Sequence, residues 1–161
     1  MIRNDVLVTF GKVLAVGHYL FAGSALLAVA RGRGALVVVG LGVDLLENDR
    51  VAMELTRGEW LLDDGIFTPE EIRYCNNGRN SGRRYALCFA AKEATLKAIN
   101  ADVRDLGIFR EVEVHPGVDG QYRLILRGSV KTQFERLGGK HIRLSVAGTA
   151  RSTAAMVLME N

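Results

Sequence analysis

The chain has 161 residues, of which 48% are hydrophobic and 24% are charged. This is the length of a single domain, and the composition is too apolar for a disordered chain. The sequence holds only two cysteines, Cys75 and Cys88, and they lack a CxxC spacing. That argues against a disulfide framework and against a zinc site built from cysteines.

The formal net charge is +3, which taken alone suggests an acidic partner such as nucleic acid. The charge is unevenly distributed, however. Residues 1–35 hold four basic residues and one acidic residue, and the remaining 17 basic and 17 acidic residues lie in 36–161. The body of the chain is therefore neutral. Because it also lacks an interleaved aromatic and basic platform, we expect no nucleic-acid partner.

An uncharged apolar stretch of 18 residues runs from Val13 to Ala30 and is followed by Arg31 and Arg33. As a helix it would be about 27 Å long, slightly short of a membrane's hydrocarbon core. Three interpretations are open: a membrane anchor with the arginines on the cytoplasmic side, a signal peptide, or an extension loosely attached to the folded part. We treat residues 1–35 as an apolar, basic N-terminal extension and leave membrane contact through it open.

Residues 36–161 begin with one predicted strand and three predicted helices. A β-branched run predicts a buried strand with Asp44 at its end. Thr68, Pro69 and Glu71 match the start of a capped helix. The expected elements are a strand over Leu36–Val43, a helix over Glu47–Arg57, a helix starting at Thr68, a loop over Asn76–Gly82 and an Ala-rich helix over Arg84–Asn100.

The second half of the chain predicts a hairpin, a helix and two further strands. Two alternating segments flank Pro116–Gly120, which predicts a β-hairpin. The elements are the hairpin strands Glu111–His115 and Gln121–Arg127, a helix over Ser129–Leu137, and strands over Ile142–Ala147 and Thr153–Leu158. This order predicts an α+β fold with a mostly antiparallel sheet and packed helices.

Three features place charge where chemistry could use it. Asp44 follows an apolar strand, although an acid there is also common as a helix cap or turn residue. Glu93 and Lys97 are four residues apart and share one face of an Ala-rich helix, although such a pair is also common as an exposed ion pair. The third feature, which could equally be a solvated surface, is a cluster of four arginines: Arg73, Arg79, Arg83 and Arg84.

Together these residue types suit phosphate chemistry with magnesium. Mg²⁺ prefers oxygen ligands and usually takes one or two carboxylates together with substrate phosphates. A lysine supplies a point charge for phosphate oxygens, and arginines supply forked donors. The sequence contains no P-loop, no Gly-x-Ser-x-Gly elbow and no His-Glu-x-x-His helix, and its three histidines lack metal-ligand spacing.

Two motifs resemble those of holo-[acyl-carrier-protein] synthases, which are small 4′-phosphopantetheinyl transferases. The run GVDLLENDRV, residues 42–51, resembles their first motif. FAAKEA, residues 89–94, followed by Lys97, resembles their second and is the more specific of the two. The resemblance covers about residues 36–161, with the motifs in the family's order. Two further segments resemble the family: Phe67–Glu71 and Leu144–Thr149.

The resemblance implies transfer of the 4′-phosphopantetheine group of coenzyme A to a serine of an apo acyl carrier protein, with release of adenosine 3′,5′-bisphosphate. It implies that Asp44 and Glu93 bind Mg²⁺, that Glu93 and Lys97 are catalytic, and that Lys97 also contacts the coenzyme. Arg50 would face the acidic carrier protein. The resemblance further implies a homotrimer with active sites between subunits. It implies a cytoplasmic enzyme, or a membrane-tethered one facing the cytoplasm if the extension is an anchor.

Three positions depart from the family's pattern. Cys88 stands where the family usually has an arginine, Gly148 where it has a histidine, and Asn100 where it has a glycine that ends the helix. Arg84, one turn before Cys88, is expected to replace part of the lost contact with the coenzyme. Asn100 can still adopt the left-handed conformation of a helix cap. The departures leave an alternative open: a catalytically degenerate relative that binds carrier protein or coenzyme A without turnover.

Overall fold

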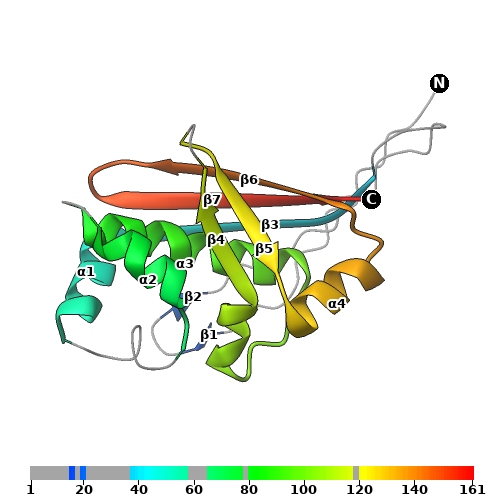
Figure 1. Cartoon of the computed structure of the whole chain (residues 1–161), viewed down its shortest axis with the longest axis horizontal. Coiled ribbons are helices and arrows are strands. Elements are labelled where there is room, and N and C mark those ends of the chain that lie inside the picture. The colour runs from blue at the N-terminus through cyan, green and yellow to red at the C-terminus, as the bar shows by residue number, and fades with distance from the viewer. Residues whose placement is uncertain (1–14, 17–18, 21–36, 58–64, 78–79, 118–119) are drawn as a thin grey trace.

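The computed structural model describes residues 15–16, 19–20, 37–57, 65–77, 80–117 and 120–161. In this part of the chain the main sheet has three antiparallel strands in the order β3 (Val38–Glu47), β7 (Ser152–Glu160) and β6 (His141–Gly148). A separate antiparallel hairpin joins β4 (Val112–Pro116) and β5 (Tyr122–Leu126). Figure 1 shows the hairpin crossing the long direction of the main sheet.

Helix α3 (Ser81–Ala98) packs against β3 and β7 and is the centre of the fold. Helices α1 (Asn48–Arg57) and α2 (Pro69–Asn76) both pack on α3 and lie together at one end of the molecule. Helix α4 (Gly128–Arg136) lies towards the other end and contacts a 3₁₀ helix, η1 (Leu106–Glu111). The predicted α+β class with mostly antiparallel pairing is therefore confirmed.

Local differences from the predicted elements have identifiable causes. Strand β3 extends past Val43 to Glu47 because it pairs with β7 along its whole length, so Asp44 lies inside the strand, opposite Ala155, rather than after its end. The predicted loop over residues 76–82 is shorter, since α3 already begins at Ser81. The 3₁₀ helix η1 was not predicted.

Most of the predicted N-terminal extension, residues 1–35, lies outside the described residues. Its described parts, β1 (Ala15–Val16) and β2 (Tyr19–Leu20), pair as short antiparallel strands. A helical interpretation is therefore wrong for these four residues. Within the described part of the chain, no helix is long and apolar enough to cross a membrane.

Strand β3 and helix α3 approach each other closely at two glycines. Gly42 faces Ala94, and a Cβ atom built on Gly42 would overlap the Ala94 carbonyl oxygen. Gly40 lies in the same way against the carbonyl group of Ala98. Two small residues on each side let the two backbones touch directly, which larger side chains would prevent.

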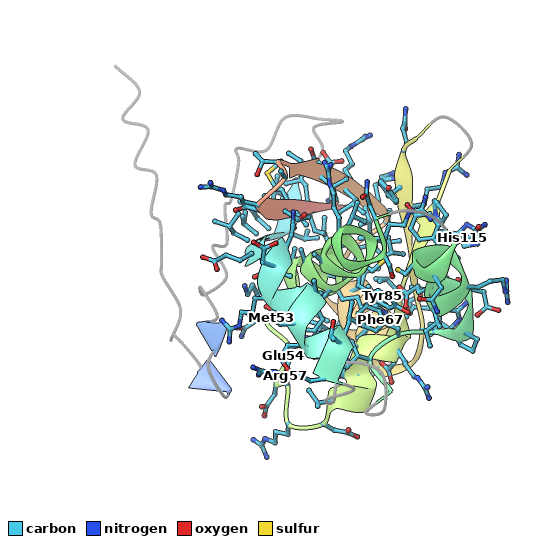
Figure 2. The ribbon with its side chains drawn as sticks, turned by 90° about the vertical axis from the view of Figure 1, so that its left-hand side faces the viewer. Met53, Glu54, Arg57, Phe67, Tyr85 and His115 are labelled. Atoms are coloured by element: carbon cyan, nitrogen blue, oxygen red, sulfur yellow. The ribbon has the colours of Figure 1, made fainter. Side chains whose placement is uncertain are left out.

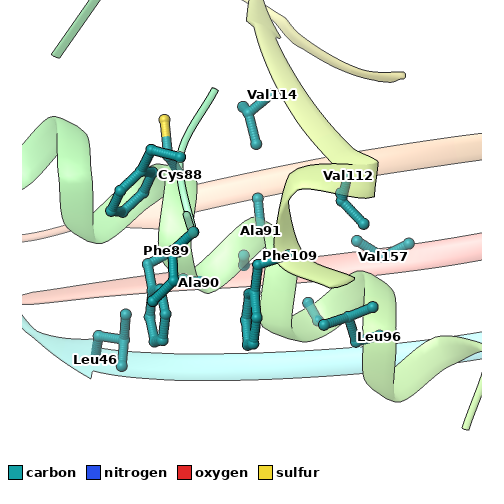
Figure 3. Packing of buried hydrophobic residues seen from close by; sticks show 14 of the residues in the cluster. Leu46, Cys88, Phe89, Ala90, Ala91, Leu96, Phe109, Val112, Val114 and Val157 are labelled. Carbon is teal, nitrogen blue, oxygen red and sulfur yellow. The ribbon is translucent and has the colours of Figure 1, made fainter. Parts of the chain in front are cut away.

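An aromatic cluster fills the space on the other side of α3. The rings of Phe89 and Phe109 stack with centroids 5.4 Å apart, and Phe67 meets Tyr85 edge to face at 4.9 Å. Figure 3 shows Phe89 and Phe109 side by side, with Leu46 of β3 to the left of Phe89. These contacts join α3 to η1 and to the segment before α2, so the hydrophobic core is continuous from the sheet to the smaller helices.

Helix α3 ends at a left-handed residue, as expected from Asn100. This residue has a φ of 52°. Its N–H donates to the Lys97 carbonyl oxygen at 3.0 Å, and the N–H of Ala101 donates to the Leu96 carbonyl oxygen at 2.9 Å. This is the hydrogen-bond pattern of a Schellman cap, which asparagine can adopt in place of glycine. The departure at this position therefore leaves the helix end intact.

Replacing Gly42 with alanine should destabilise the fold by about 3 kcal/mol or more, because the new methyl group has to displace backbone rather than a flexible side chain. Urea unfolding followed by circular dichroism measures the loss. Gly120→Ala is the matched control: nothing lies within 4 Å of its added Cβ, and its φ of 77° is the main penalty, about 1–2 kcal/mol. Equal losses in the two variants would contradict the close backbone contact.

Candidate active site

Asp44, Glu93 and Lys97 meet at the contact between β3 and α3. The Lys97 ammonium lies 2.6 Å from Oδ1 of Asp44 and 3.5 Å from Oε2 of Glu93. It also donates to the Val43 carbonyl oxygen at 3.4 Å. The structure thus brings together, from residues far apart in the sequence, the three side chains that the motifs singled out.

All three side chains are buried. Asp44 is 6% exposed, Glu93 3% and Lys97 8%. The alternative interpretation of Glu93 and Lys97 as an exposed ion pair is therefore wrong, as is that of Asp44 as a helix cap or turn residue. Buried charges are costly unless compensated, so this cluster carries an energetic penalty that a purely structural surface pair would not.

One oxygen of each carboxyl group lacks a hydrogen-bond partner among the described residues. These atoms are Oδ2 of Asp44 and Oε1 of Glu93, and both are buried. Burial raises the pKa of Glu93 to about 8, the negative charge of Asp44 adds to the shift, and Lys97 opposes it. Two carboxyl groups beside a single lysine leave an excess of negative charge when both are ionised.

This donor set fits a small divalent cation. Buried carboxylate oxygens without partners are the hard oxygen ligands that Mg²⁺ prefers, and two carboxylates are the number that a magnesium–phosphate site commonly uses. Across the described ranges, no group of three or more His, Cys, Asp or Glu side chains is arranged to hold a metal. With two protein carboxylates, such an ion would take its other ligands from water and phosphate oxygens.

The structure does not bring Arg84 to this cluster. Its guanidinium donates to the Tyr74 carbonyl oxygen at 2.8 Å and to that of Asn77, and it lies over the Tyr74 ring. These contacts cap the C-terminal end of α2. Along α3, Arg84 is about 13 Å from Glu93. Arg50 lies on α1 and is half-buried.

The remaining arginines of the predicted cluster are dispersed. Arg73 pairs with Glu70 at 3.4 Å on the surface, and Arg83 donates to the Gly148 carbonyl oxygen at 3.1 Å. Arg79 lies outside the described residues. The predicted cluster of four is therefore not a single patch in the part of the chain that the structure describes.

A fully buried ion pair on another face of α3 was missed by the sequence analysis. Lys92 lies 2.8 Å from Oε2 of Glu71, and both side chains are 0% exposed. The Lys92 ammonium also donates to the carbonyl oxygens of Phe109, at 2.9 Å, and Val112. Oε1 of Glu71 accepts from the Val114 N–H at 2.8 Å. Burial lowers the pKa of Lys92, while the charge of Glu71 opposes that shift. The signal available in the sequence was a lysine inside an otherwise apolar helix.

Asn48, the first residue of α1, was also missed. Its side-chain amide donates to the carbonyl oxygens of Thr149 and Ala150, and its Oδ1 accepts from the Thr153 hydroxyl at 2.7 Å. Its own N–H donates to the Arg151 carbonyl oxygen at 2.7 Å. This residue fastens the β6–β7 turn to the start of α1. A lone asparagine gives no sequence signal for such a distant partner.

Sequence relatives match this chain over most of its length. A family model described as "4'-phosphopantetheinyl transferase superfamily" matches residues 40–154. A holo-[acyl-carrier-protein] synthase of Solibacter usitatus is 39% identical over 125 residues, covering 78% of this chain and 100% of the relative. The synthase of Koribacter versatilis is 35% identical over 126 residues, with the same coverage of both chains.

Solved structures also match the fold of this chain. The holo-[acyl-carrier-protein] synthase of Neisseria meningitidis matches the fold with a TM-score of 0.68 at 23% identity, covering 78% of this chain and 100% of that one. An ACPS–CoA complex from Chronobacterium ammoniagenes matches with a TM-score of 0.62 at 26% identity, covering 78% and 97%. The chain belongs to the 4′-phosphopantetheinyl transferase superfamily and, within it, to the holo-[acyl-carrier-protein] synthase family.

The raised pKa of Glu93 predicts a pH-dependent stability difference in metal-free protein. Between pH 4.5, where the unfolded residue ionises, and about 8, the folded residue keeps its proton. The free energy of unfolding therefore falls as pH rises through this window. Glu93→Gln cannot ionise and should become the more stable protein, by about 1 kcal/mol or more at pH 8, since one unit of pKa corresponds to about 1.4 kcal/mol.

Chemical denaturation in the presence of EDTA at pH 4, 6 and 8 measures this difference. At pH 4 the two proteins should be nearly equal in stability, which serves as the internal control. A constant difference across the three pH values would show that the substitution acts through packing and not through ionisation.

Proposed function

We propose that this protein transfers the 4′-phosphopantetheine group from coenzyme A to a serine hydroxyl of an apo acyl carrier protein and releases adenosine 3′,5′-bisphosphate. The observation that carries the proposal is the buried cluster of Asp44, Glu93 and Lys97, with two carboxyl oxygens left without partners. The membership of the family and the coenzyme A complex of a relative support it.

Asp44 and Glu93 would hold Mg²⁺ through the two oxygens that lack partners. When bound, the ion would neutralise negative charge on the coenzyme's pyrophosphate. Lys97 is already placed between the two carboxyl groups and can turn its positive charge towards the same phosphates. Such group transfer depends on positioning and electrostatic stabilisation more than on covalent chemistry by the protein.

Glu93 is the proposed base for the attacking serine. It would accept the hydroxyl proton directly or through a bound water, as a general base must lie within hydrogen-bond reach of the proton it takes. The rigidity of α3, which is held by its backbone contact with β3, keeps the Glu93 carboxyl group in one place. Precise placement of this kind supplies much of the rate in transfer reactions.

Helix α1 is the proposed docking surface for the carrier protein. Figure 2 shows α1 in front, with Met53 and Arg57 on it. Met53 is 53% exposed, and Arg57 is in the last turn of the helix. Arg50, on the same helix, would add a positive charge that steers an acidic carrier towards the active site.

A catalytically degenerate protein is the second candidate. It is favoured by Cys88 and Gly148, which bring no charge where the family usually has an arginine and a histidine. Arg84, the expected substitute for the first of these, is bonded to the end of α2. Two missing charge-assisted contacts with the coenzyme, at about 1.5–3 kcal/mol each, would weaken its binding by orders of magnitude. Such a protein would bind carrier or coenzyme without turnover.

Incubation with coenzyme A, Mg²⁺ and several apo carrier proteins decides between the two. The intact mass of a carrier should increase by one phosphopantetheine group. Asp44→Ala and Glu93→Gln should lower the transfer rate by about 100-fold or more, since each removes charge stabilisation at the reacting phosphate. Glu70→Gln, at an exposed surface pair, is the matched control and should transfer normally. Calorimetric binding without any mass increase would establish the degenerate protein instead.

We also propose that the protein is a homotrimer with active sites between subunits. The face of the main sheet turned away from α3 carries exposed apolar side chains: Val43 at 50%, Leu45 at 68% and Met156 at 46%. Val43 and Met156 are opposite each other in the β3–β7 register. An exposed apolar patch on paired strands is typical of a protein interface.

Leu45→Glu should dissociate the assembly, because it places a charge in the apolar patch. Light scattering coupled to size-exclusion chromatography should change from a trimer mass to a monomer mass. Arg104→Glu is the control and should stay trimeric, because this side chain is 87% exposed and pairs only with the exposed Asp102 among the described ion pairs. A wild-type protein that elutes as a monomer at all concentrations would refute the trimer.

We propose that the transferase domain spans residues 36–161. We also propose that the protein acts in the cytoplasm. The alignments to the curated relatives cover 78% of this chain and the whole of each of those two relatives, which supports a complete catalytic domain in the matched part. A variant lacking residues 1–35 should therefore transfer phosphopantetheine at the rate of the full chain in the same mass assay.

A further inference from the structure

Helix α3 contacts α2 through a row of residues spaced four apart. Arg84 donates to the Tyr74 carbonyl oxygen, and Lys92 pairs with Glu71. Between these two contacts the row continues with Cys88, which faces α2. In Figure 3 the sulfur of Cys88 points away from β3. Position 88 therefore belongs to the α2–α3 interface and not to the cluster around Glu93.

Cys88 meets Cys75 of α2 at this interface. The two Sγ atoms are 3.8 Å apart, and both residues are 0% exposed. A disulfide has its sulfurs about 2.05 Å apart. The gap of less than 2 Å lies within the arc that a cysteine sulfur sweeps about its Cα–Cβ bond. These are the only two cysteines in the sequence, so an intramolecular disulfide has one pairing.

The thiols are protected while the interface is closed. The hydrogen bond with Cys75, followed by burial, raises the pKa of the Cys88 thiol well above its usual value. A protonated, buried thiol reacts slowly with oxidants. Both residues are 0% exposed, so an oxidant reaches the two sulfurs only when α2 moves away from α3 in a local opening.

We propose that Cys75 and Cys88 form a redox-responsive crosslink between α2 and α3, which a small-molecule disulfide oxidant closes when α2 opens. One protein thiol, as its thiolate, attacks a sulfur of the oxidant and releases one small thiol, leaving a mixed disulfide. The second protein thiol attacks the protein sulfur of that mixed disulfide and releases the other small thiol. Two protein thiols are oxidised, one disulfide is reduced to two thiols, and the two protons go to the leaving groups.

The crosslink closes a loop that contains residues 76–87 and so restricts the unfolded chain. It should raise the melting temperature by about 5 to 10 °C, given the usual effect of a disulfide across a loop of this size. It leaves Asp44, Glu93 and Lys97 unchanged, so the inference is independent of the proposed function.

The test is treatment of the folded, full-length protein with oxidised glutathione, followed by intact mass, peptide mapping without reduction, and thermal unfolding. The expected product has lost two hydrogen atoms, carries a Cys75–Cys88 peptide link, and melts at the higher temperature until dithiothreitol restores the original value. Cys75→Ala and Cys88→Ala are matched controls. Each keeps one cysteine and cannot form an internal disulfide, so oxidised glutathione should not raise its melting temperature.

Three outcomes would overturn the proposal. The first is that both thiols stay reduced in the folded protein at oxidant concentrations that oxidise them fully in urea. The second is a stable glutathione adduct or a disulfide-linked dimer in place of the internal link. The third is an internal link that lowers the melting temperature, because such a link would distort the α2–α3 interface instead of fitting it.

Discussion

The backbone contact between Gly42 and Ala94 determines the geometry on which the rest of the structure depends. Strand residues two apart share a face, so Gly40, Gly42 and Asp44 all point towards α3. Ala94 follows Glu93 directly, and Lys97 is one turn later. When the two backbones touch at Gly42, the short Asp44 side chain reaches the Lys97 ammonium at 2.6 Å. Residues without any chemistry of their own thus set the distances between those that have it.

A second constraint fixes α3 from the opposite side. Lys92 and Glu93 are neighbours in sequence. Lys92 faces the Glu71 carboxylate and the carbonyl oxygens of Phe109 and Val112, whereas Glu93 lies beside Lys97, which pairs with Asp44. The Lys92 pair is fully hydrogen-bonded, whereas one oxygen of Glu93 has no partner among the described residues. Removing either Lys92 or Glu71 would leave an uncompensated buried charge. The pair therefore disfavours any rotation of α3 about its axis that would separate the two side chains. On the face of α3 with Lys92, both charged groups of the ion pair have partners. On the face with Glu93, which is proposed to bind substrate, a carboxyl oxygen has no partner among the described residues.

Much of the fold could be predicted from the sequence because local signals agree with the tertiary structure. Thr68 and Glu71 form the expected capping box, and Asn100 ends α3 in the left-handed conformation. The meeting of Asp44, Glu93 and Lys97 followed from two motifs that resemble a family, since spacing alone left each residue with a more ordinary explanation.

The remaining features depend on distant partners. Glu71 is a helix cap by sequence, and nothing local reveals that the same carboxylate also neutralises Lys92. The sequence places Asp44 after the end of its strand. Pairing with β7, more than 100 residues later, extends the strand past Asp44, and the local sequence does not reveal that partner. Arg84 is expected to contact the coenzyme, and its guanidinium donates in the structure to the carbonyl oxygens of Tyr74 and Asn77 at the end of α2, which its spacing from Cys88 does not reveal. Sequence spacing identifies which face of a helix a residue lies on and cannot identify what lies opposite.

The strand order of the main sheet has a consequence for how the protein is made. Among the residues that the structure describes, β3 pairs in the main sheet with β7 alone, and the last paired residue of β7 is Glu160. During synthesis the strand that carries Asp44 leaves the ribosome more than 100 residues before its partner strand β7. Long-range pairing of this kind folds slowly and leaves strand edges exposed in the meantime. Helix α3, which is complete earlier, can cover one face of that strand during the delay, so Asp44 and the pair of Glu93 and Lys97 can come together on the nascent chain before the sheet closes.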